Sequence, residues 1–137
     1  MHSYVHGYSE QEAIRLKDQA GTLAKLIHYD SLWQEDSLIL EAGCGVGAQT
    51  QTVAPQNPDC QFISVDISHE SISEAQKMAE ERGIRNVNFQ QANIFELPFP
   101  KAHFDHVFVC FVLEHLPDPQ RAFRKLLDVL KPGGTLT

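Results

Sequence analysis

The feature that most constrains this fold is the segment 38–47, LILEAGCGVG, where an apolar run ends in a carboxylate followed by alternating glycines. The apolar run is typical of a buried strand, and glycine adopts positive φ at little steric cost. Side chains at Gly43, Gly45 and Gly47 would keep a ligand away from the backbone. A strand, such a turn and a following helix form a nucleotide-type site at the end of a parallel sheet. The carboxylate of Glu41, two residues before Gly43, is a further indication of which nucleotide-type ligand binds.

Hydrophobic periodicity predicts strands that alternate with helices from residue 38 onward, after a first amphipathic helix at 9–29. The expected strands cover 38–42, 61–66, 87–90 and 104–111, and a fifth follows the turn at 132–134. Helices are expected at 47–54, ending near Pro55, at 68–82, capped by Ser68, and from Pro119 onward. In the last helix, Phe123, Leu126, Leu127 and Leu130 are expected to face inward. This alternation predicts an α/β fold with a doubly wound parallel sheet.

Composition limits the classes of partner. The 137 residues suit one domain, and 11 basic against 18 acidic residues give a net charge of -7 without a basic stripe. We therefore expect neither a nucleic acid nor a membrane as partner. Three scattered cysteines predict a reduced, cytoplasmic protein, and neither they nor the histidines show metal-ligand spacing. Residues 126–137 end at the start of a predicted strand, so we expect them to belong to the front part of a longer protein.

Asp66 is the second strong signal for a nucleotide. It ends the second predicted strand, and a carboxylate there accepts hydrogen bonds from two ribose hydroxyls. Asp66 lies 21 residues after Gly45, a spacing that a dinucleotide site would also have. The pattern Gly43-x-Gly45-x-x-Ala48 likewise fits the dinucleotide-binding fingerprint, although such a match alone is weak. The alternative is that Asp66 only caps the helix after it.

Five ordered motifs make the chain resemble the class I S-adenosylmethionine (SAM)-dependent methyltransferases, over residues 38–137. The motifs are LEAGCGVG at 40–47, VDIS at 65–68, QANIFELPF at 91–99, FDHV to LEHL at 104–116, and LKPGGTL at 130–136. The resemblance implies a Rossmann-like sheet with strand order 3-2-1-4-5 and more strands beyond residue 137. It also implies one SAM-binding domain over 1–137, with a lid and helix at 1–30 and a core at 38–137 that is incomplete.

The resemblance implies binding roles for residues at the glycine turn and after the second strand. The backbone of Gly43, Cys44 and Gly45 would approach the methionine carboxylate and the sulfonium, and amides of the turn would favour the anion. Glu41 would accept from the cationic amino-acid end, directly or through water. Asp66 would hold the ribose hydroxyls.

Other cofactor-binding residues follow from the same resemblance. Ile67 would pack on the adenine face, and the N–H of Ile94 would donate to the ring. Asn93 stands where the family usually has aspartate, and its amide oxygen still accepts from the adenine amino group. Cys110 and Phe111 would line the methionine side.

No catalytic residue is assigned. His115 is the candidate base, since an imidazole accepts a proton near neutral pH; we favour the alternative that it only helps to turn the chain before Pro117. Cys44 is more simply a small filler of the turn than a nucleophile. Tyr8 either shields the sulfonium as part of a lid or belongs to a frayed terminus. Trp33 is expected to be a packing residue.

The sequence thus predicts transfer of a methyl group from SAM to an unidentified acceptor, with a small molecule as the default partner. Methyl transfer needs mainly alignment of acceptor and methyl group. One alternative is an NAD(P)-dependent oxidoreductase, which Glu41 and the segment 97–99 argue against. The other is a SAM-binding module without catalysis, which needs the same pocket. The sequence does not indicate the oligomeric state.

Overall fold

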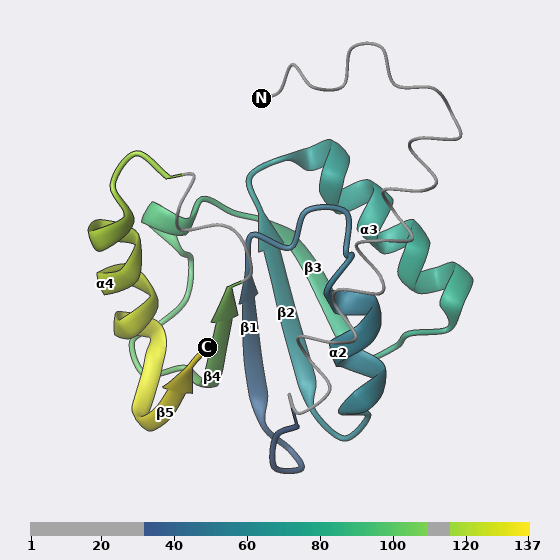
Figure 1. Ribbon diagram of the computed structural model, residues 1–137, viewed down its shortest axis with the longest axis horizontal. Coiled ribbons are helices and arrows are strands. Elements are labelled where there is room, and N and C mark those ends of the chain that lie inside the picture. Colours follow the sequence, from purple (N-terminus) through teal and green to yellow (C-terminus); the bar gives the residue numbers. More distant parts are fainter. Residues whose placement is uncertain (1–31, 110–115) are drawn as a thin grey trace.

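The computed structural model describes residues 32–109 and 116–137, which form a five-stranded, fully parallel sheet with the order β3-β2-β1-β4-β5. Figure 1 shows the strands between the helices, with β1 at the centre. The strands are β1 (Leu38–Ala42), β2 (Gln61–Asp66), β3 (Val87–Gln91), β4 (Phe104–Val109) and β5 (Leu130–Leu136). The helices are α2 (Thr50–Gln56), α3 (His69–Arg82), α4 (Pro119–Val129) and the short 3-10 helix η2 (Ile94–Glu96). The predicted fold class and strand order are confirmed.

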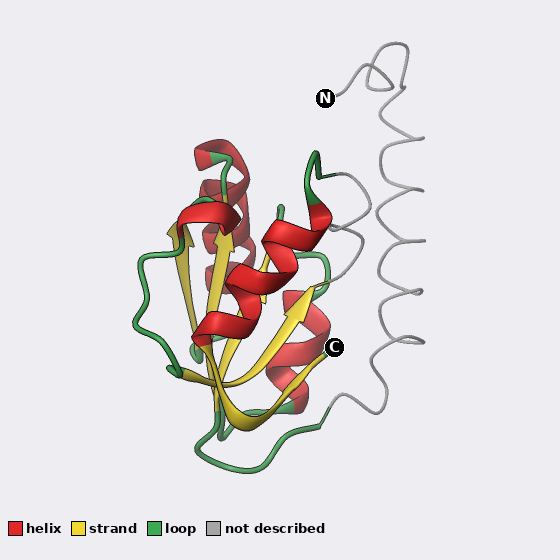
Figure 2. Cartoon of the chain, turned by 90° about the vertical axis from the view of Figure 1, so that its left-hand side faces the viewer, coloured by secondary structure: helices red, strands yellow, loops and turns green. Residues whose placement is uncertain are grey.

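The sheet separates two apolar layers because successive side chains of a strand point to opposite faces. On one face Leu40 and Val107 pack with Leu126 of α4. On the other face Ile39 and Phe108 pack with α2, and α3 contributes a neighbouring cluster. Figures 1 and 2 show α4 on one side of the sheet and α2 with α3 on the other. Among residues 32–109 and 116–137, no helix has the length and apolar character that a membrane crossing requires.

Trp33 packs beside β2 and β4, as predicted. Its ring stacks on Phe108 at a centroid distance of 5.7 Å and meets Phe62 edge-on at 6.0 Å. These contacts place the residue before β1 against the same face as α2, so the chain enters the sheet through an aromatic cluster.

The predicted helix at 47–54 begins later and ends later than expected, since α2 spans Thr50–Gln56 and contains Pro55. Gly47 has φ +89, which lies outside the right-handed helical region, so the helix cannot begin there. Pro55 removes only one donor near the end of a seven-residue helix, which therefore continues past it. Of the predicted strand at 104–111, the structure describes β4 to Val109, and residues 110–111 lie outside the described residues.

The inward face of α4 differs from the prediction. Leu126 is buried as expected, but Phe123 and Leu127 are 41% and 43% exposed, and Ala122 and Val129 take their place in the core. Positions 122, 126 and 129 are spaced by four and three residues, so they form one stripe on the sheet side. Phe123 and Leu127 lie about 100° further around the helix.

The turn expected at 132–134 lies within β5, which already begins at Leu130 rather than belonging to the preceding helix. The pairing with β4 shifts register there, from Phe104–Leu130 to His106–Thr135. A side chain at Gly134 would come within 2.5 Å of the Asp105 carbonyl oxygen, so the irregular strand needs a glycine at this position.

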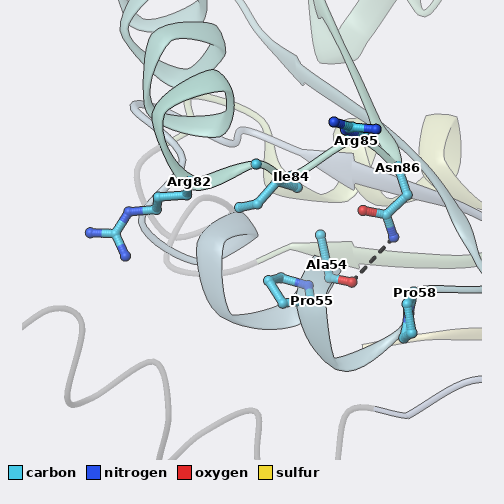
Figure 3. Close-up of a pocket in the computed structure, with 8 residues that line it drawn as sticks. Ala54, Pro55, Pro58, Arg82, Ile84, Arg85 and Asn86 are labelled. Atoms are coloured by element: carbon cyan, nitrogen blue, oxygen red, sulfur yellow. Dashed lines mark hydrogen bonds between the residues drawn. The ribbon is translucent and has the colours of Figure 1, made fainter.

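Asn86 joins three segments at the amino-terminal edge of the sheet. Its Nδ2 lies 3.2, 2.9 and 3.1 Å from the carbonyl oxygens of Ala54, Asn57 and Cys60. Figure 3 shows the side chain reaching across to Ala54 at the end of α2. One amide group therefore satisfies the end of α2 and the start of β2 together.

Asn86→Ala is expected to lower the free energy of unfolding by about 1–3 kcal/mol, because three backbone carbonyls lose the Asn86 amide as a donor and, among the described residues, only those of Ala54 and Asn57 keep a backbone N–H. Urea unfolding followed by far-UV circular dichroism measures the change. Asn88→Ala is the matched control, since Asn88 is exposed on β3 and its Oδ1 accepts a hydrogen bond from the neighbouring Gln90 amide rather than joining distant segments. Equal midpoints for the two variants would contradict this account of the edge.

Candidate functional site

The glycine turn after β1 uses its three glycines in different ways. Gly43, Gly45 and Gly47 all have positive φ, at 75°, 55° and 89°. A side chain at Gly47 would meet the terminal methyl of Met78 at 2.5 Å, so this glycine allows α3 to pack on the turn. A side chain at Gly45 would meet nothing within 4 Å. Among the described residues, Gly45 therefore has open space beside its α-carbon, where a ligand can approach the backbone.

The amides of the turn already have partners. The N–H groups of Gly43 and Cys44 donate to the Val65 carbonyl at 2.8 and 2.9 Å, and that of Gly45 donates to Asp66 at 2.9 Å. These three amides are therefore engaged within the protein, and anion binding by the amides at the start of the following helix stays a prediction. The bonds of the three amides hold the turn against the end of β2.

Asp66 links the turn to the start of α3. Its Oδ2 accepts from the N–H of Gly45, and its Oδ1 accepts from the N–H of Ser68, both at 2.9 Å. The carboxylate therefore faces the turn, and each oxygen retains a lone pair for a further donor. The N-cap of α3 is Ser68, whose hydroxyl accepts from the N–H of Ser71 at 3.2 Å. The alternative that Asp66 is the cap of this helix is wrong.

Glu41 lies in the core under the turn and is only 2% exposed. Its Oε1 accepts hydrogen bonds from the hydroxyls of Thr50 and Ser64, the latter at 2.7 Å. Burial raises the pKa of the Glu41 carboxyl, and the two hydroxyls oppose that shift. Ser64 is the register partner of Glu41 across β1 and β2. The sequence analysis missed both hydroxyls; a polar residue inside the apolar run of β2 was the available signal for Ser64.

A hollow of about 370 Å³ opens at the carboxyl ends of the strands, beside Asp66. Ile67, which is 66% exposed, contributes to its wall. Its lining consists of Gly43, Val65, Asp66, Ile67, Ala92, Asn93, Ile94, Phe95, Leu116 and Pro117. The hollow is thus a mainly apolar space with one carboxylate at its edge. Five predicted cofactor residues line it, namely Gly43, Asp66, Ile67, Asn93 and Ile94, whereas Glu41, Cys44 and Gly45 do not.

Asn93 shapes the wall of this hollow. Its Oδ1 accepts from the N–H of Phe95 at 2.9 Å and so caps η2. The amide oxygen therefore has only its second lone pair for a ligand. The N–H of Ile94 donates to no other described residue, and it lies in the same wall.

Cys44 is 6% exposed, and its thiol lies 3.5 Å from the Gly45 carbonyl oxygen. Burial, with smaller contributions from the charges of Glu41 and Asp66, raises the pKa of the thiol. A buried, protonated thiol is a poor nucleophile, and Cys44 packs in the cluster with Ile72 and Ala75, so both observations favour the interpretation of Cys44 as a filler of the turn. Tyr8, Cys110, Phe111 and His115 lie outside the described residues.

A second hollow, of about 280 Å³, lies between the ends of α2 and α3 near Pro55 and Pro58. The Asn86 amide beside it is already bonded to backbone carbonyls, and Figure 3 shows the side chains of Arg82 and Arg85 extending in different directions. Because its charged groups do not converge, we take the hollow beside Asp66 as the candidate site.

Comparison with known proteins agrees with this geometry. Residues 40–137 match the family described as "Methyltransferase domain". The 27-O-demethylrifamycin SV methyltransferase of Amycolatopsis mediterranei is 30% identical over 132 residues, which are 96% of this chain and 48% of that enzyme. The crystal structure of YcgJ from Bacillus subtilis has a TM-score of 0.70 at 29% identity, over 87% of this chain and 49% of that one. That of the [4+2]-cyclase SpnF has a TM-score of 0.71 at 31% identity, over 96% and 46%.

The chain therefore belongs to this methyltransferase domain family, within the class I SAM-dependent methyltransferases. It spans about half the length of these relatives. The family match covers the whole sheet except the first two residues of β1, so it includes both the glycine turn and Asp66.

The raised pKa of Glu41 makes a prediction about stability. Because the folded protein favours the neutral carboxyl, folding takes up a proton above the ordinary pKa of 4.5, and stability falls as the pH rises through the window from 4.5 to the raised value. Glu41→Gln removes this titration. The unfolding free energy of the variant is therefore expected to rise relative to that of the parent chain as the pH increases above 4.5, and to level off once the pH passes the raised pKa.

Urea unfolding at a series of pH values measures the difference between the parent and Glu41→Gln. Glu70→Gln is the control, since Glu70 is exposed in the first turn of α3. A difference between the parent and Glu41→Gln that stays constant with pH would show that the buried carboxyl does not titrate as stated.

Proposed function

We propose that this chain is the cofactor-binding part of an enzyme that transfers a methyl group from SAM to a small-molecule acceptor. The observation that carries the proposal is the position of Asp66, whose carboxylate lies at the mouth of the glycine turn and at the edge of an apolar hollow. A ribose needs a carboxylate that accepts from two hydroxyls, and an adenine needs an apolar slot beside it. The family match supports SAM as the nucleoside ligand.

The residues present fit this cofactor. Asp66 would accept from the ribose hydroxyls with the lone pairs that Gly45 and Ser68 leave free. Ile67 would cover one face of the adenine, and the free N–H of Ile94 would donate to the ring. The open space above Gly45 would admit the part of the ligand that continues from the ribose.

Of the two roles that the resemblance allows for Glu41, direct contact with the cationic end or contact through water, its burial favours the second. Two hydroxyls occupy its Oε1, and the side chain is buried. We propose that it acts on the cationic amino-acid end through water, and that Thr50 and Ser64 hold it in position. SAM itself supplies an activated methyl group, so the protein mainly aligns the acceptor and excludes water.

The roles of the residues outside the described part stay predictions. Tyr8 is proposed to belong to a lid at 1–30, and Cys110 with Phe111 to the methionine side. The core is proposed at 38–137, and His115 remains the candidate base. A small-molecule acceptor is supported by the net charge of -7 and by the rifamycin-modifying relative. The free thiols of Cys44 and Cys60 are consistent with the cytoplasm as the proposed location.

A second function, SAM binding without methyl transfer, is favoured by one observation. SpnF is described as a [4+2]-cyclase, yet it shares the fold and 31% identity with this chain. The same fold therefore occurs in a protein that is named for a reaction other than methyl transfer. Incubation with SAM labelled in the methyl group, over several classes of acceptor, separates the two functions: labelled product supports methyl transfer, and tight SAM binding without any labelled product supports the second function.

Asp66→Asn is expected to weaken binding of S-adenosylhomocysteine by about ten- to a hundredfold, because the ribose loses a charged acceptor. Isothermal titration calorimetry measures the change, and Glu70→Gln on the adjacent helix should bind as the parent does. The parent should bind the 2′-deoxy analogue of the ligand more weakly than S-adenosylhomocysteine. Asp66→Asn should bind the two ligands about equally, which a merely misfolded variant would not reproduce.

Titration of the parent with NAD tests the oxidoreductase alternative at the same site. Binding of NAD without binding of SAM or S-adenosylhomocysteine would overturn the proposed function. Equal affinity of the parent and Asp66→Asn for S-adenosylhomocysteine would remove Asp66 from the site.

A further inference from the structure

Two short segments form the side of the hollow that faces α4. One is η2 with its flanks, which contributes Asn93, Ile94 and Phe95, and the other is the pair Leu116 and Pro117, just before α4. Both segments are connections rather than strands, so the rigid sheet does not fix the distance between them. Packing of Ile94 on the core holds part of this wall, and one further side-chain contact links η2 to α4 directly.

Arg121 makes that contact. Its guanidinium carbon lies 5.0 Å from the centroid of the Phe95 ring, within the range of a cation–π interaction. Arg121 forms no ion pair with any residue in 32–109 or 116–137, so the aromatic ring is the partner of its charge within that part of the chain. Because Phe95 lines the hollow and Arg121 belongs to α4, this pair joins the two segments of the wall.

The backbone N–H groups of Phe95 and Arg121 are both hydrogen-bonded to side chains. Asn93 Oδ1 accepts from the N–H of Phe95, and Asp118 Oδ1 accepts from the N–H of Arg121 at 3.1 Å. Ile94 packs against the core cluster that contains Leu126 of α4. The backbones of η2 and of the first turn of α4 are therefore ordered, and the Arg121–Phe95 contact sets how their exposed ends face each other.

We propose that Arg121 is a positioning residue for the nucleoside: by holding the Phe95 ring, it keeps the wall formed by residues 93–95 at the right distance from Ile67 for an adenine. The proposal rests on the proposed function, since it assigns the hollow to the nucleoside part of SAM. Arg121 itself does not line the hollow, so it acts through Phe95.

Binding of S-adenosylhomocysteine, measured by isothermal titration calorimetry, tests the proposal. Arg121→Gln should weaken binding by about two- to fivefold, the range for a partly solvated cation–π contact. Arg121→Lys keeps a cation and should recover most of the affinity. Arg124→Gln is the matched control on the same helix, because Arg124 lines a separate hollow with Pro119 and Phe123.

The pair is tested by the variant Phe95→Leu. Adding Arg121→Gln to Phe95→Leu should weaken binding no further, because the ring that the cation contacts is gone. Hydrogen–deuterium exchange of residues 93–97 in the ligand-free chain gives a second readout: Arg121→Gln should raise it, and Arg124→Gln should not.

The outcomes separate the two proposals. If the parent binds S-adenosylhomocysteine but Arg121→Gln binds it equally well, or if the loss persists in the Phe95→Leu background, Arg121 does not position the wall and the proposed function stands. If the parent does not bind the ligand at all, the proposed function fails and this inference fails with it.

Discussion

The site depends on the two hydrogen bonds that the Asp66 carboxylate accepts from backbone N–H groups. The carboxylate receives one backbone N–H from the turn after β1 and another from the start of α3, so a single side chain fixes two segments that the sequence separates. The carbonyl of Val65, one residue earlier, receives the amides of Gly43 and Cys44. The end of β2 therefore organises the whole glycine turn. Within the described residues, no atom lies within 4 Å of the place where a side chain at Gly45 would start, and Gly43 lines the hollow beside Asp66.

The sheet topology places this constraint where a ligand can reach it. β1 pairs with β2 on one side and with β4 on the other, so the chain reverses its direction of sheet growth next to the turn. Ligands of open α/β sheets bind at such a switch point, outside the carboxyl ends of the strands. The buried Glu41 and its two hydroxyl donors lie directly beneath, and they make the base of the turn polar without exposing it to water.

Much of this arrangement was predictable, because the relevant forces act locally along the chain. The glycine spacing, the apolar runs and Ser68 as a cap determine the turn, the strands and the start of α3 over a few residues each. Contacts between distant segments were not predictable in the same way. Ser64 meets Glu41 only because β2 lies in register beside β1, Thr50 meets it only because α2 packs back under the turn, and Phe95 meets Arg121 only through the packing of α4.

The errors have similar physical causes. Pro55 was expected to end a helix, yet near the end of a short helix it costs only one hydrogen bond. Phe123 and Leu127 were expected to be buried because they are apolar, yet the narrow contact between α4 and the sheet takes only the stripe that holds Ala122, Leu126 and Val129.

The most direct test of the account is a crystal structure of the chain with S-adenosylhomocysteine. The account predicts both ribose hydroxyls within hydrogen-bonding distance of the Asp66 carboxylate, the adenine between Ile67 and the segment 93–95, and the chain of the ligand passing Gly45. A nucleoside bound elsewhere, or an Asp66 carboxylate that contacts no atom of the ribose, would contradict it.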